Sequence, residues 1–269
     1  MEDGEDWLYL GEYYNNNRYS GYGHVFGETK SKTLYLGRNV CNTYTSYRTF
    51  LGLSTVTISN SVTSLGDYIF DGEDALESVY IPSSVKEIGD GTFRGCTGLT
   101  RMVIPSSVKS IGDYAFKECN ISFIQLPNSV ESIGKYAFSE CTNLNRINIP
   151  PSVTSISKGT FSGCTSLTKM SVAATTPPEI EDENFTNFHY LNLVVKVPVG
   201  SLTAYQSADV WKNFWDIQED PALGIGDNLI IDVKNEGAPI YNLQGIEMEN
   251  VNELPRGVYI QNGKKRVIN

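Results

Sequence analysis

Cysteine is the residue type in this chain whose spacing most suggests chemistry. The 269 residues include five cysteines, and the last four lie 23, 22 and 23 residues apart, so they recur once per internal repeat. No Cys-x-x-Cys pair is present, and the two histidines, His24 and His189, lie far from any cysteine cluster, so a zinc site has almost no support. The spacing instead predicts buried thiols that stack coil over coil. The five are Cys41, Cys96, Cys119, Cys141 and Cys164.

Acidic side chains gather in two short clusters, Asp71-Gly72-Glu73-Asp74 and Glu181-Asp182-Glu183. Weak calcium binding is conceivable for either cluster, but solvated loop carboxylates are the interpretation that we favour. The chain contains no G-x-S-x-G, H-E-x-x-H or G-x-x-x-x-G-K motif, and two histidines leave few options for general-base chemistry. The sequence therefore predicts a protein that is not an enzyme and that binds no metal or cofactor.

The composition excludes several classes of partner. The 21 Lys and Arg against 31 Asp and Glu give a net charge of -10, and no basic stripe is present, so nucleic acid would be repelled. No apolar run approaches the roughly 18 residues that span a bilayer, which predicts no transmembrane segment. The first six residues, MEDGED, are acidic, unlike a signal peptide. Either the protein is cytosolic or a leader has been removed.

A repeat of about 23 residues decides the fold class. Its third unit reads LTRMVIPSSVKSIGDYAFKECN, and every unit keeps the same apolar addresses. The opening six residues predict a short strand whose fourth and sixth side chains point inward, as in Met102 and Ile104. A proline then ends the strand, a second short apolar segment follows, and Asp-Tyr-Ala-Phe predicts a brief helical or 3₁₀ turn. The regular units are 53–75, 76–98, 99–120, 121–143 and 144–166.

One phenylalanine recurs at the same place in every unit, 23, 23, 22 and 23 residues apart. One aromatic ring repeated in every coil predicts a spine in the core rather than a ligand platform. A single coil cannot bury its own apolar face, so neighbouring coils must stack and the ends need caps. The spine residues are Phe70, Phe93, Phe116, Phe138 and Phe161.

Both ends of the repeat array have cap-like sequences. Leu8-Tyr9-Leu10-Gly11 and Leu34-Tyr35-Leu36-Gly37 echo each other, with His24-Val25-Phe26 and Thr49-Phe50 at the place of the spine, which predicts two degenerate coils. Downstream, Pro177-Pro178 interrupts the pattern, and residues 200–215 predict a short amphipathic helix. We expect the aromatic residues at its end to seal the core: Trp211, Phe214 and Trp215.

The repeat h-x-x-h-x-I-P-x-S-V-x-x-I-G-x-x-A-F-x-x-C resembles the BspA-type leucine-rich-repeat family of bacterial surface and secreted proteins. The resemblance covers residues 34–166 strongly and extends loosely to about residue 220. It implies a leucine-rich-repeat solenoid of short parallel strands with turns and short helical segments. It also implies adhesion to host matrix proteins or to other cells, although fold alone is weak evidence of function.

The last residues, 222–269, do not follow the repeat pattern. Asn262-Gly263 between alternating segments predicts a β-hairpin. The tail resembles the small β-rich sorting domains of exported bacterial proteins, which implies secretion or display at the cell surface; a plain hairpin subdomain is the alternative. We therefore expect four regions: degenerate coils and cap at 1–52, five regular repeats at 53–166, a second cap at 167–221 and a small all-β module at 222–269.

The third and fifth positions of each strand are predicted to face solvent on one side of the solenoid. Aromatic residues and arginines in company are typical of interface hot spots, and this set is basic on an acidic protein. We expect it to bind a host extracellular-matrix or cell-surface protein, or a glycan. The alternative is that the composition of this face is due to chance and that the solenoid is only a spacer or assembly scaffold. A second candidate surface is formed by the N-terminal tyrosines Tyr13, Tyr14, Tyr19 and Tyr22. The candidate ligand-binding residues are Tyr80, Arg101, Val103, Phe123, Gln125, Arg146 and Asn148.

Overall fold

A computed structural model describes residues 33–37 and 52–223 with their side chains. It also describes β1 (Gly4–Leu10), β3 (Arg38–Asn42) and four strands after residue 239 as backbone elements. The chain divides into two compact units, residues 1–223 and 224–269. His24, Val25, Phe26, Thr49, Phe50 and the tyrosines from Tyr13 to Tyr22 lie outside the described residues.

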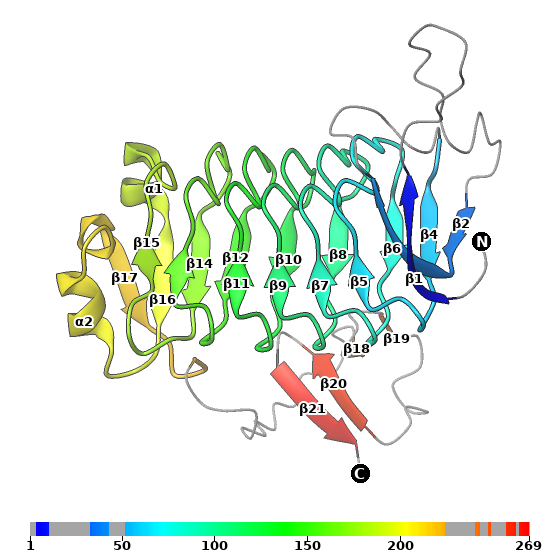
Figure 1. Cartoon of the computed structure of the whole chain (residues 1–269). Helices are drawn as coiled ribbons and strands as arrows, with labels where there is room; N and C mark the ends of the chain where they lie inside the picture. The colour runs from blue at the N-terminus through cyan, green and yellow to red at the C-terminus, as the bar shows by residue number, and fades with distance from the viewer. Residues whose placement is uncertain are drawn as a thin grey trace, which may run out of the picture. The chain divides into compact units, whose positions relative to one another are not determined.

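The first unit contains a stack of coils, each contributing one strand to the same side, where the strands form two parallel sheets (Figure 1). Its first sheet joins β2 (Thr33–Leu36), β4 (Thr55–Ile58) and β6 (Ser78–Tyr80). The stack continues with β8 (Arg101–Val103), β10 (Phe123–Gln125), β12 (Arg146–Ile149), β14 (Lys169–Val172), β16 (Val194–Val197) and β17 (Asp216–Glu219). All pairs are parallel and in the register that the repeat predicts, for example Ile124 opposite Met102 and Ile147.

A second line of two-residue strands comes from the apolar segment after each proline. β5 (Ser64–Leu65), β7 (Glu87–Ile88), β9 (Ser110–Ile111) and β11 (Ser132–Ile133) form one parallel sheet, and β13 (Ser155–Ile156) pairs with β15 (Glu179–Ile180). Apolar side chains of both lines of strands fill the space between them, with Ile124 of the first line and Ile88 and Ile156 of the second fully buried. The predicted solenoid is confirmed.

The phenylalanine spine is confirmed as well. All five rings are fully buried and stack with centroids 5.4–6.0 Å apart. Phe185 adds a further ring 5.9 Å beyond Phe161, so the repeat continues through the segment where Pro177-Pro178 seemed to interrupt it. Each added ring extends one continuous core, which is how a solenoid stabilises coils that could not fold alone.

The turn before each phenylalanine is not helical, contrary to the sequence prediction. Tyr68, Tyr114 and Tyr136 have φ of 54°, 58° and 55°, in the left-handed region, where Gly91 and Gly159 stand in the other coils. A left-handed residue interrupts a helical turn. It lets the N–H of that residue reach the next coil instead, as in Tyr68 N–H to Asp90 O at 2.7 Å.

The C-terminal end of the stack is closed by α1 (Asn187–Asn192), α2 (Leu202–Ser207) and the 3₁₀ turn Trp211–Asn213. Trp211 is buried, and its indole N–H donates to the Pro178 carbonyl at 2.7 Å. Phe214 packs edge-on to Phe185 at 5.1 Å, so these two aromatics seal the core as expected. Trp215 does not: it follows the turn with its side chain outward and 83% exposed.

At the N-terminal side, β2 pairs with β4 in register, with Leu34 opposite Val56. The echo of this strand, Leu8-Tyr9-Leu10, pairs instead with β3, with Leu8 opposite Val40. The two similar sequences therefore do not hydrogen-bond to each other as neighbouring coils.

The second unit contains β18 (Ile240–Asn242), β19 (Glu247–Met248), β20 (Gly257–Gln261) and β21 (Lys264–Ile268) in one antiparallel sheet. β20 and β21 pair antiparallel with Gln261 opposite Lys264, which agrees with the hairpin that the sequence predicts; Asn262-Gly263 lies outside the described residues.

Candidate functional site

The strand face is the outward side of β2, β4, β6, β8, β10, β12 and β14. Period-two alternation within these strands buries the fourth side chain of each unit and turns the third and fifth outward. Strand register then lines up these outward side chains in two rows within each of two sheets, one of β2, β4 and β6 and one that includes β8, β10, β12 and β14. The third-position row is Thr33, Thr55, Ser78, Arg101, Phe123, Arg146 and Lys169; the fifth-position row is Tyr35, Thr57, Tyr80, Val103, Gln125, Asn148 and Ser171.

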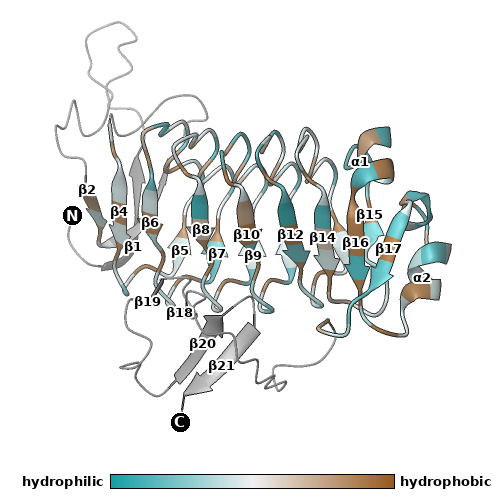
Figure 2. Cartoon of the chain, turned by 180° about the vertical axis from the view of Figure 1, so that it is seen from behind, coloured by the Kyte–Doolittle hydropathy of each residue, from teal (hydrophilic) through white to brown (hydrophobic). Residues whose placement is uncertain are grey.

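Arg146 and Phe123 form the centre of the strand face. The guanidinium carbon of Arg146 lies 4.1 Å from the centroid of the Phe123 ring, in a cation–π contact. Phe123 is therefore half-buried rather than exposed, because the arginine covers it. Figure 2 shows the hydrophobic colour of β10 between the hydrophilic colour of β8 and β12. The contact uses the face of the guanidinium and not its N–H groups.

Three cations of the strand face have no acidic partner among the described residues: Arg101, Arg146 and Lys169. They occupy the same row, with Arg101 opposite Phe123 and Arg146 opposite Lys169. No outward position from β2 to β14 carries an acid. On a chain of net charge -10, this row is a concentrated region of unpaired positive charge.

Asn148 differs from the other predicted site residues, because its amide is committed to the backbone. Its Nδ2 donates to the Leu126 carbonyl and its Oδ1 accepts from the Leu126 N–H, both at 2.8 Å. The amide thus extends the pairing between β12 and the shorter β10. Asn148 is a structural residue of the strand face rather than a free contact.

The remaining predicted residues are exposed on the strand face. Tyr80 is 52% and Val103 41% exposed, and Arg101, Gln125 and Arg146 are exposed too. The prediction omitted Lys169 and Tyr35 from the site. Tyr35 is 52% exposed and aligns with Thr57 and then Tyr80, at spacings of 22 and 23 residues that would have revealed it. Whether these residues bind a ligand stays a prediction.

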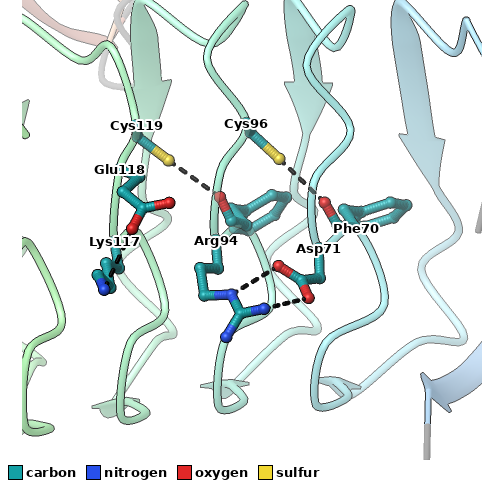
Figure 3. Close-up of polar contacts among 8 residues, drawn as sticks. Phe70, Asp71, Arg94, Cys96, Lys117, Glu118 and Cys119 are labelled. Atoms are coloured by element: carbon teal, nitrogen blue, oxygen red, sulfur yellow. Dashed lines mark hydrogen bonds and ion pairs between the residues drawn. The ribbon is translucent and has the colours of Figure 1, made fainter. Parts of the chain in front are cut away.

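The turn edge is a different part of the solenoid surface, made by the turns at residues 66–74, 89–97, 112–120, 134–142 and 157–165, which follow the second line of strands. Its acidic cluster is not solvated as we expected. Asp71 and Glu73 are buried, and the Arg94 guanidinium of the next coil donates to both Asp71 oxygens at 2.8 and 2.9 Å (Figure 3). Burial nevertheless raises the pKa of the Asp71 carboxyl, and the contact with Arg94 opposes that rise.

Other carboxylates of the turn edge are used within the fold. Asp67, Asp90 and Asp113 each accept the backbone N–H at the equivalent place of the next coil, at 2.6–2.8 Å. Glu183, from the second acidic cluster, accepts from the Tyr136 hydroxyl at 2.6 Å and pairs with Lys158 at 3.0 Å. These contacts lower the pKa of Glu183. The acids therefore join coil to coil.

The repeated cysteines are confirmed as buried thiols. Cys96, Cys119, Cys141 and Cys164 each donate from Sγ to the carbonyl of the spine phenylalanine one coil back, at 3.0–3.1 Å (Figure 3). Burial raises the pKa of all four thiols, that of Cys141 to about 12. A buried thiol held in the protonated form is a poor nucleophile and a poor metal ligand. The side chain of Cys41 lies outside the described residues.

Within the described residues, no group of three or more His, Cys, Asp and Glu side chains is arranged to hold a metal ion. His189 is buried in the cap, where Nδ1 accepts from the Thr186 N–H at 3.1 Å and Nε2 lies 3.0 Å from the Cys164 carbonyl. Both ring nitrogens are thus used in the fold. No helix in the described part of the chain is long and apolar enough to cross a membrane.

The repeat pattern matches a known family along most of the solenoid. Six copies of the BspA type Leucine rich repeat region match residues 25–122 and 109–204. The chain belongs to this family. The solenoid is therefore a BspA-type leucine-rich repeat, as the resemblance of the sequence implied. No curated protein matches the chain.

Solved structures of leucine-rich repeat proteins are similar to parts of the chain. A protein from Bacteroides ovatus ATCC 8483 is 31% identical, with 56% of this chain and 42% of that protein covered and a TM-score of 0.49. The T. pallidum Leucine Rich Repeat protein is 27% identical, with 62% and 77% covered and a TM-score of 0.47. A leucine rich cell surface protein from Faecalibacterium prausnitzii A2-165 is 17% identical, with 68% and 78% covered and a TM-score of 0.34. The chain spans less than half the length of the Bacteroides ovatus protein.

Proposed function

We propose that this BspA-type protein is a non-enzymatic binding protein, secreted or displayed at the cell surface, that holds a host protein or glycan on its strand face. The observation that carries the proposal is the row Arg101, Phe123, Arg146 and Lys169. Its three cations have no acidic partner in the described residues. On the turn edge, by contrast, Arg94 pairs with Asp71 and Lys158 pairs with Glu183. Unpaired arginines beside an aromatic ring are the usual centre of a binding interface.

Export is part of this proposal. It is supported by the resemblance of residues 222–269 to sorting domains and by the antiparallel pairing of β20 with β21. A spacer or assembly scaffold is the second candidate function, because stacked coils that bind nothing would have the same core.

The test compares binding by two triple variants. Wild type, Arg101→Ala/Phe123→Ala/Arg146→Ala and a control, Lys86→Ala/Lys135→Ala/Phe188→Ala, are applied to immobilised host matrix proteins and to a glycan array. The control also removes two exposed cations and one exposed aromatic ring, from positions off the strand face. Circular dichroism verifies that both variants fold.

We expect the strand-face variant to lose at least tenfold in affinity and the control to bind as wild type does. Equal binding by the two variants, or no binding by wild type, would remove the strand face as the site and favour the scaffold role.

A further inference from the structure

Two pairs of outward side chains on the strand face are each spaced two coils apart, and Lys169 follows Arg146 in the next coil. Tyr35 and Tyr80 share the fifth-position row with Thr57 between them, and Arg101 and Arg146 share the third-position row with Phe123 between them. Neighbouring strands lie about 4.8 Å apart, so the members of each pair are separated by roughly 9–10 Å along the stack. A ligand that meets both pairs must therefore extend along the stack and repeat with about that period.

The two arginines are arranged to take anionic oxygens. A guanidinium binds a carboxylate or sulfate through two parallel N–H donors, and this geometry is most selective when the group is already oriented. Phe123 supplies that orientation to Arg146 through the 4.1 Å contact. The outward positions of β2 to β14 carry no acid, so none of these side chains repels an anionic chain.

The rest of the strand face is rich in neutral hydrogen-bonding groups. Thr57 and Gln125 are exposed, and Ser78 is exposed beside Tyr80. Hydroxyl and amide groups exchange hydrogen bonds with sugar hydroxyls, and a tyrosine offers both a ring for sugar C–H groups and a phenol oxygen. A flat surface of this composition suits a polar, unbranched polymer better than the apolar anchors of a folded protein.

The spacing also separates a glycan from an acidic peptide. Side chains on one side of an extended peptide recur about every 6.6–6.8 Å, which does not coincide with positions roughly 9–10 Å apart. A linear glycan in which every second sugar carries an acidic group repeats over one disaccharide, a length close to two strand spacings.

We propose that the strand face binds a linear acidic glycan that lies along the stack, with its anionic group on every second sugar. Arg101 and Arg146 receive successive anionic groups, and Tyr35 and Tyr80 contact alternate sugar rings. This inference rests on the proposed function, because it names the ligand class of the same face.

The experiment measures binding by calorimetry to four probes: hyaluronan oligosaccharides, the same oligosaccharides with their carboxylates reduced to alcohols, heparin oligosaccharides and poly-glutamate. Hyaluronan carries a carboxylate on every second sugar and no sulfate, so it distinguishes a carboxylate from the sulfates of heparin. We expect an acidic glycan to bind, the reduced glycan to lose at least tenfold, and poly-glutamate to bind more weakly by a similar factor. Heparin carries anionic groups on both sugars of its disaccharide, so binding to heparin alone would overturn the alternate spacing.

Two double variants test the residues. Arg101→Lys/Arg146→Lys keeps both charges but loses the planar donors, and we expect about a tenfold loss; Lys86→Ala/Lys135→Ala removes two exposed charges elsewhere and should change affinity less than threefold. Equal binding to poly-glutamate, or no binding to either acidic glycan, would overturn the inference. If the strand-face triple variant still loses a protein ligand in that case, the proposed function stands; if it loses nothing, both fail.

Discussion

The strand face and the turn edge belong to the same coils, yet they use charged residues differently. On the turn edge, Arg94 pairs with Asp71, and Lys158 pairs with Glu183, each across neighbouring coils. On the strand face, Arg101 and Arg146 carry the same charge with no acidic partner in the described residues. Charges on the turn edge therefore join neighbouring coils, whereas Arg101 and Arg146 on the strand face make no such ion pair with the described residues.

The difference follows from the geometry of the two sides. Turns bend the chain, so side chains and backbone N–H groups of successive coils meet at an angle and can satisfy one another. Strands of the sheet satisfy their own backbone groups through the ladder, and their outward side chains stand perpendicular to it. Substitutions on the two sides should consequently have different effects on stability.

The largest effect is expected from Arg94→Ala on the turn edge. Removal of the guanidinium leaves the buried Asp71 carboxylate without this partner, so we expect the free energy of unfolding at pH 7 to fall by about 2–3 kcal/mol. Chemical denaturation measures this change. Asp71→Asn, which removes the buried charge, should cost less, and the double variant should recover part of the loss.

The loss in the free energy of unfolding caused by Arg94→Ala should depend on pH. The pKa of Asp71 is already raised above 3.8 by burial, and it rises further without Arg94. A carboxyl group whose folded pKa exceeds its unfolded pKa binds a proton more tightly in the folded state, so protonation stabilises the fold. The difference between wild type and Arg94→Ala should therefore shrink as pH falls from 7 toward 4. A difference that is constant with pH would contradict this account of the pair.

An intermediate effect is expected from Asn148→Ala, which tests the structural exception on the strand face. The substitution leaves the Leu126 N–H and carbonyl without their side-chain partner, and we expect a loss of about 1–2 kcal/mol in the free energy of unfolding. Gln125→Ala, at the opposite residue of β10, is the matched control and should change stability by less than about 0.5 kcal/mol. Equal effects would mean that the amide does not support β10.

The smallest effect on stability is expected from Arg101→Ala/Arg146→Ala. Both side chains are exposed and unpaired with acids, so the substitution removes only the contact with Phe123, and stability should stay within about 1 kcal/mol of wild type. Thermal unfolding followed by circular dichroism measures it. A loss of more than about 2 kcal/mol would show that these arginines serve the fold, and the contrast between the two sides would then fail.

The sequence by itself determined the solenoid. The recurrence of Phe116 and its equivalents and of the buried cysteines follows from one coil being repeated, and the alternation at Met102 and Ile104 follows from strand geometry. The outward positions of Arg101 and Arg146 were predictable for the same reason. These are properties of a single coil, and the sequence shows them again in each successive repeat.

Only the tertiary structure decided how one coil meets the next. The burial of Asp71 depends on Arg94, 23 residues later, and the amide of Asn148 is fixed by Leu126 of the preceding coil. The left-handed Tyr114, in place of a helical turn, directs its N–H to Lys135 of the following coil. Trp215 is exposed because Trp211 and Phe214 already close the core. Each of these features depends on a contact between coils, so it could not be predicted from the sequence pattern of a single coil.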